Sequence, residues 1–100
     1  MSENNEVVVG DFKISESVLN KMIRESAAAI EGVSSIKDVT VKPADEALSV
    51  ELMLVMDHKM VYPEVGQNVQ TAVAADVERM TGIKVAEVSV MVERLDFSRE

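Results

Sequence analysis

Residues 47–57 read ALSVELMLVMD, and every second position, from Leu48 to Met56, carries an apolar side chain. Successive side chains of a strand point to opposite faces of a sheet, so this segment is predicted to be a strand with one wholly apolar face. The opposite face is polar at both ends and holds Met53 and Val55 in the middle. A second segment repeats the alternation, with four positions predicted on one face: Ala86, Val88, Val90 and Val92.

The segment between these strands, Pro63–Met80, is predicted to be a helix that ends at Gly82 in a left-handed conformation. Its length of roughly 27 Å lies close to the roughly 33 Å of a ten-residue strand, so the helix can cover the apolar face. Two strand orders remain open: the crossover joins parallel neighbours, or it skips one position and leaves all neighbours antiparallel. The predicted buried stripe consists of Val65, Val69, Ala72, Val73, Val77 and Met80.

The preceding half of the chain adds a helix and a strand. Ser15 is a predicted N-cap, and the helix is expected to continue to Glu31, with Gly32 as its stop. Ile36–Lys42 is the next predicted strand, and the turn residues that follow it predict an antiparallel hairpin with residues 47–57. The predicted buried stripe of this helix is Leu19, Met22, Ile23, Ala27 and Ile30.

These elements predict an α+β fold in the order helix, strand, strand, helix, strand, with both helices on one face of a three-stranded sheet. The sheet would have four strands if Val7–Ile14 adds a short edge strand. We expect one domain over residues 7–97, a flexible segment at 1–6 and a frayed end at 98–100.

Composition excludes several classes of protein. The chain has 100 residues, no cysteine and a formal charge of −8. The absence of cysteine excludes a disulfide framework and thiolate catalysis, and it fits a cytoplasmic location. An acidic surface repels phosphate backbones, which argues against nucleic acid as a partner. The longest wholly apolar run is Leu52–Met56, so we expect neither a signal peptide nor direct membrane insertion.

No pattern in the sequence predicts a catalytic, cofactor-binding or metal site. His58 is the only histidine, and Asp57 is the only acid close to it, which is poor spacing for zinc. No G-x-S-x-G elbow or glycine-rich phosphate loop occurs. We therefore expect His58 to be an exposed turn residue. A small nucleic-acid-binding module and a small-metabolite enzyme that uses His58 are the weaker alternatives to an interaction protein.

The outer face of the sheet is the candidate interaction face. Methionine packs adaptably and is common on binding surfaces, whereas Met22, Met56 and Met80 are expected in the core. Two alternatives assign no binding function to this face: scattered surface apolar residues need no partner, or the N-terminal segment covers the face. The predicted face consists of Thr40, Met53, Val55, Ser89 and Met91.

Several short motifs, in this order and spacing, resemble one family. They are Gly10-x-x-x-Ile14-Ser15, Glu31-Gly32-Val33, Tyr62-Pro63-Glu64-Val65 with Asn68-Val69-Gln70, and Met80-Thr81-Gly82-Ile83 before the last strand. The chain from about Val7 to Phe97 thereby resembles the alkaline shock, or cell-envelope stress response, family of Gram-positive bacteria. It departs from that family in lacking a glycine at Asp57–Val61 and in lacking a longer charged tail after Glu100.

The resemblance implies a cytoplasmic protein without established catalytic activity. It implies a protein partner, including self-association, and in some relatives a small integral membrane anchor that holds the protein at the membrane. It supplies no catalytic residues. Four positions transfer as signatures of the fold only: Gly32, Pro63, Gln70 and Gly82.

Overall fold

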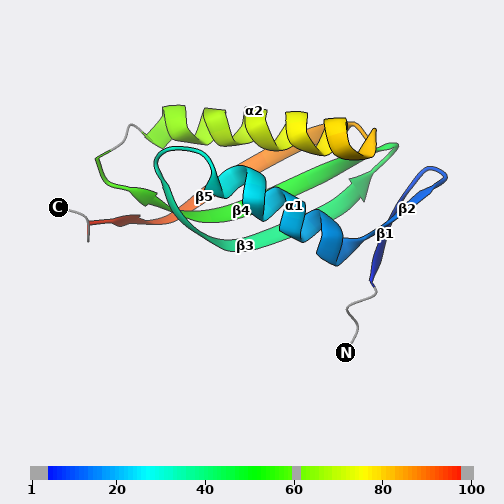
Figure 1. The fold of residues 1–100 in the computed structure, drawn as a ribbon, viewed down its shortest axis with the longest axis horizontal. Coiled ribbons are helices and arrows are strands. Elements are labelled where there is room, and N and C mark those ends of the chain that lie inside the picture. Colours follow the sequence, from blue (N-terminus) through cyan, green and yellow to red (C-terminus); the bar gives the residue numbers. More distant parts are fainter. Residues whose placement is uncertain (1–4, 60–61, 98–100) are drawn as a thin grey trace.

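The computed structural model describes residues 5–59 and 62–97, except for the side chain of Tyr62, and it confirms the α+β fold (Figure 1). The expectations for residues 1–4, 60–61 and 98–100 concern positions outside the described residues. The elements are β1 (Glu6–Val9), β2 (Phe12–Ser15), α1 (Glu16–Ala28), β3 (Val33–Ala44), β4 (Ala47–Asp57), α2 (Tyr62–Thr81) and β5 (Val85–Asp96).

The main sheet has the strand order β3-β4-β5, so the segment quoted first is the central strand. β3 pairs antiparallel with β4, as the short turn between them predicted. β4 pairs parallel with β5, and the crossover through α2 therefore joins neighbouring strands. Of the two strand orders left open by the sequence, this is the first.

Both helices lie on the same side of the sheet and contact each other (Figure 1). On the covered face of β4, Leu48, Val50, Leu52, Leu54 and Met56 are buried, as their alternation predicted. On α2, the buried stripe repeats every four residues and consists of Val65, Val69, Val73 and Val77. On α1, Leu19, Ile23 and Ala27 complete the same core.

The N-terminal segment differs from the prediction. Gly10, with φ +58°, lets the chain turn back on itself, and β1 pairs with β2 in a separate two-stranded sheet. Among the described residues the main sheet therefore has the predicted three strands, and the conditional fourth strand does not form. Val7 and Val9 nevertheless join the main core, so this hairpin closes one end of it. Glu6, which the sequence analysis assigned to the N-terminal segment, pairs with Ser15 in this hairpin.

Three further expectations are wrong in detail. α1 ends at Ala28, three residues before Glu31, although Gly32 does adopt a positive φ in the loop that follows. Met80 is 50% exposed, because it lies off the four-residue repeat that the core contacts. Ala86 is exposed because the register of β4 and β5 shifts between Leu48 and Ser49, which places an extra residue at this point of β5.

A polar contact joins the two helices beside this core. Ser26, which is buried on α1, donates its hydroxyl to Asp76 Oδ2 at 2.7 Å, and Arg79 Nη2 lies 3.0 Å from Asp76 Oδ1. The hydrogen bond from Ser26, followed by that from Arg79, lowers the pKa of the Asp76 carboxyl from its ordinary value. The contact therefore favours the carboxylate form.

We expect this contact to make stability depend on pH at the acidic end. A carboxyl whose pKa is lower in the folded state stabilises the fold fully above its unfolded pKa of about 3.9. That contribution is lost as pH falls through the folded pKa. Asp76→Asn should remove the contribution and cost no more than about 1 kcal/mol at neutral pH, because the side chain is partly exposed.

Urea unfolding of the parent and of Asp76→Asn between pH 2 and 6 measures the effect. The two stabilities should converge as the pH falls. Glu25→Gln is the matched control, since it removes an exposed carboxylate of α1 away from this contact. A difference between parent and Asp76→Asn that stays constant over the whole range would contradict the prediction.

Candidate interaction face

The face of the main sheet opposite the helices carries a shallow hollow. The strand register places Asp38, Met53 and Met91 in one row across the three strands, and Thr40, Glu51 and Ser89 in the next. These two rows, with Leu52 and Val90, line a hollow of about 290 Å³. Met91 is 60% exposed and is the most exposed apolar group of the hollow. We call this hollow the open-face site.

Four of the five predicted residues line the open-face site: Thr40, Met53, Ser89 and Met91. The fifth, Val55, is only 1% exposed, so its place on a docking surface is wrong. The register shifts on both sides of Val55, with one extra residue in each neighbouring strand: Ser34 in β3 and Glu93 in β5. Bulged strands bend and twist more strongly, and Val55 is enclosed between them.

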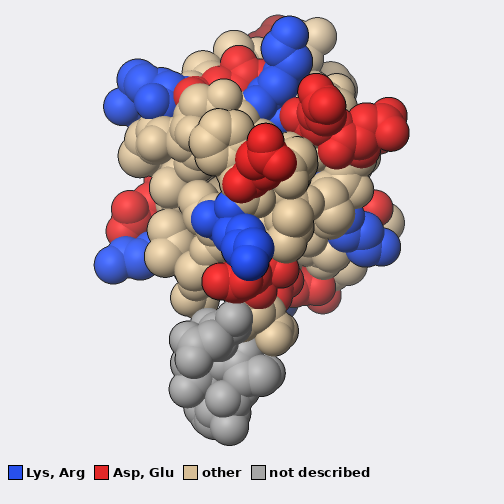
Figure 2. All heavy atoms as spheres, turned by 90° about the vertical axis from the view of Figure 1, so that its right-hand side faces the viewer, with Lys and Arg blue, Asp and Glu red and all other residues tan. Residues whose placement is uncertain are grey.

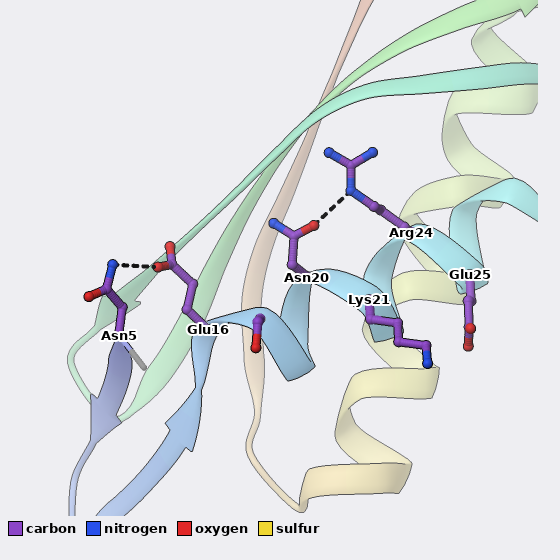
Figure 3. Close-up of a pocket in the computed structure, with 7 residues that line it drawn as sticks. Asn5, Glu16, Asn20, Lys21, Arg24 and Glu25 are labelled. Atoms are coloured by element: carbon purple, nitrogen blue, oxygen red, sulfur yellow. Dashed lines mark hydrogen bonds between the residues drawn. The ribbon is translucent and has the colours of Figure 1, made fainter. Parts of the chain in front are cut away.

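Two side chains of α1 donate hydrogen bonds to backbone carbonyl groups of the edge strand β3. Asn20 Nδ2 donates to the Val39 carbonyl at 3.4 Å, and Arg24 Nη1 donates to the Ile36 carbonyl at 3.3 Å. Arg24 Nε also donates to Asn20 Oδ1 at 2.7 Å, which holds the two side chains together (Figure 3). The sequence analysis did not identify this role of Arg24.

Two side chains of α2 form hydrogen bonds with the backbone of β5, the strand at the other edge of the sheet. Gln70 Nε2 donates to the Val88 carbonyl at 2.9 Å, and the Val85 N–H donates to Glu78 Oε2 at 2.9 Å. Exposed edge strands are templates for pairing with another chain. Because helix side chains occupy both edges at these points, the open face is the more accessible surface of the sheet.

Removing one of these contacts should weaken the protection of an edge. We expect Gln70→Ala to cost about 1 kcal/mol, the usual net value of one hydrogen bond, and to increase edge-to-edge association on heating. Gln67→Ala, one turn away on the exposed side of α2, is the control. Urea unfolding and light scattering during heating measure the two effects. Equal behaviour of both variants would contradict the assigned role of Gln70.

A larger hollow of about 540 Å³ lies along α1. Asn20 and Arg24 point toward the sheet there, whereas Lys21 and Glu25 point away from it (Figure 3). Its lining side chains carry both signs of charge, and Asn20 and Arg24 are already engaged with β3. This arrangement holds the helix on the sheet, and we do not assign it a ligand.

His58 does not have the environment expected for an exposed turn residue. Its side chain is 18% exposed, and its Nδ1 lies 3.0 Å from the Asp96 carbonyl oxygen and 3.6 Å from Asp57 Oδ1. Its ring lies 4.5 Å from that of Phe97, with the planes tilted by 34°. The histidine thus joins the C-terminal ends of the parallel strands β4 and β5.

The described residues contain neither a metal-binding cluster nor a membrane-spanning helix. In residues 5–59 and 62–97, no group of three or more His, Cys, Asp or Glu side chains is arranged to hold a metal ion. Over the same residues, neither helix is long and apolar enough to span a membrane.

At the end of the molecule that carries the β1–β2 hairpin, acidic and basic side chains are interspersed (Figure 2). This view contains no extended basic surface of the kind that binds nucleic acid.

Residues 34–97 match the model of the alkaline shock protein 23 family, which is described as having a cell envelope-related function. The chain belongs to this family. The matched part of the chain contains β4, α2 and β5, and with them three signature positions. Pro63 lies in the first turn of α2, Gln70 contacts β5, and Gly82 ends α2 with φ +74°. No individual curated protein matches the chain.

Solved structures of the MamM CTD share this fold. A variant of the MamM CTD superposes with a TM-score of 0.67 at 17% identity, over 81% of this chain and 99% of that one. The copper form of the MamM CTD gives the same score and identity over 85% and 91%. A doubly substituted variant gives 0.68 at 15% identity over 83% and 86%. At these identities the likeness establishes the fold alone.

Proposed function

We propose that this alkaline shock protein is a non-enzymatic interaction protein of the cell envelope system, and that it docks a protein partner through the open-face site. The observation that carries the proposal is the Met53–Met91 pair on the one sheet surface that the helices leave uncovered. Methionine side chains are flexible and polarisable, and they adapt to the shape of a partner. The hydroxyl and carboxylate groups around them supply a polar rim, as interfaces commonly have.

The first partner we propose is a second copy of the chain. Two such faces would bury four methionines against each other, and acidic groups such as Glu51 would remain at the margin. A membrane-linked protein is the other occupant, and it would place a cytoplasmic protein at the membrane without insertion of its own. The cell envelope-related function of the family supports the membrane-linked partner.

Size-exclusion chromatography with light scattering tests the proposal on the parent and on a Met53→Lys, Met91→Lys variant. Four buried ammonium groups in the interface, two from each copy, should weaken self-association at least about tenfold, because each would lose hydration. Met80→Lys is the control, since Met80 is exposed on α2 and lies away from the open-face site.

Three outcomes are distinct. Loss of association only in the open-face variant supports the second copy as partner. A monomeric parent that captures a membrane-fraction protein through these methionines supports the other occupant. A folded parent whose association and partner capture are both unchanged by the double substitution would remove the open face from consideration.

A further inference from the structure

Two methionines, the exposed Met91 and the partly exposed Met53, lie side by side on the open face. Met53 and Met91 are direct partners in the β4–β5 register. Both line the open-face site, and Met91 exposes more of its surface than any other described methionine. Met56, three residues further along β4 and on the covered face, is fully buried. The chain therefore contains accessible and protected thioethers on opposite sides of one strand.

Accessibility governs which methionines react with peroxides. In this reaction the peroxide O–O bond breaks and an S–O bond forms, so that the sulfur is oxidised by two electrons. Hydrogen peroxide is reduced to one water molecule, and the product is methionine sulfoxide. The reaction replaces a flexible apolar side chain by a polar one that accepts hydrogen bonds. Reductases return the sulfoxide to the thioether, so the modification is reversible.

We propose that Met91, followed by Met53, forms a peroxide-sensitive modification site that switches the open-face site from apolar to polar. Oxidation of this pair removes the apolar floor of the hollow, because the other lining groups are mostly hydroxyls and carboxylates. The covered face is unaffected, since Met56 lies within the core. The consequence for partner binding rests on the proposed function, whereas the chemical selectivity and the change in polarity do not.

Mass spectrometry of peptides from the full chain tests the selectivity during a time course with dilute hydrogen peroxide. Met91 should be oxidised at least about tenfold faster than Met56. Met80, which is half exposed on α2, should also react and reports oxidation away from the sheet. Oxidation of Met91 no faster than that of Met56 would overturn the proposal.

Binding of a hydrophobic fluorescent dye tests the change in polarity without any partner. Oxidation of the parent should reduce dye fluorescence at least about twofold, and methionine sulfoxide reductase should restore it. A Met53→Leu, Met91→Leu variant keeps an apolar floor that cannot be oxidised, so its dye signal should resist peroxide. Met80→Leu should lose the signal as the parent does. A double-leucine variant that responds to peroxide like the parent would also overturn the proposal.

Light scattering of the same samples separates this proposal from the proposed function. If peroxide lowers association of the parent but not of the double-leucine variant, both are supported. If selectivity and dye response are as expected while association never depends on Met53 or Met91, the modification site stands and docking through the open face fails.

Discussion

Leu54→Ala is expected to destabilise the fold by about 2–5 kcal/mol, because Leu54 is fully buried at the centre of β4 between the sheet and the helices. A domain of this size has a total stability of about 5–15 kcal/mol, so the loss is a large fraction of it. The cost combines the lost transfer free energy of the removed methyl groups with that of the cavity left behind. Urea unfolding followed by circular dichroism measures the change.

Met53→Ala is the matched control, since Met53 precedes Leu54 on the same strand and points to the opposite face. We expect it to cost less than about 1.5 kcal/mol, because the side chain is only partly buried and its surroundings are open to water. Equal losses for the two variants would contradict the one-sided core on which the open-face site depends.

The sequence predicted the central part of the fold because its periodicities are long. Eleven residues of alternation in β4 specify which face is covered, and a shift by one residue would expose every leucine. The errors lie where a single residue interrupts a pattern. The register shift beside Ala86 and those beside Val55 each reorient one side chain, and alternation alone cannot locate a bulge.

The candidate site was predicted for the same reason and within the same limits. The alternation of side chains along each strand predicted that Met53 and Met91 share one face, and the observed register makes them partners. The contacts of Asn20, Arg24, Gln70 and Glu78 with strand edges could not be derived, because they depend on which strands lie at the edges. An asparagine with an arginine four residues later, beside an apolar stripe, is the only signal that could have indicated one of them.

The second prediction concerns the folding of a fragment that corresponds to the family match, which begins at residue 34. A fragment of residues 33–97 keeps the whole main sheet and α2 but lacks α1 and the β1–β2 hairpin. The missing part supplies Leu19 and Ile23, which are fully buried, and Val7 and Val9, which are almost fully buried. Burial of such side chains contributes about 1.5–3 kcal/mol each, so their sum approaches the whole stability of the domain. We expect the fragment not to fold.

Circular dichroism and amide NMR dispersion of the fragment, each compared with the full chain, measure the outcome. Ile23→Asp in the full chain makes the same point without truncation, because it places an unpaired carboxylate in the core and should cost several kcal/mol. Lys21→Ala, on the exposed side of the same helix, should stay within about 0.5 kcal/mol of the parent. A fragment that unfolds cooperatively with native-like dispersion would show instead that the family-matched residues form an independent unit, to which α1 and the hairpin are attached without completing its core.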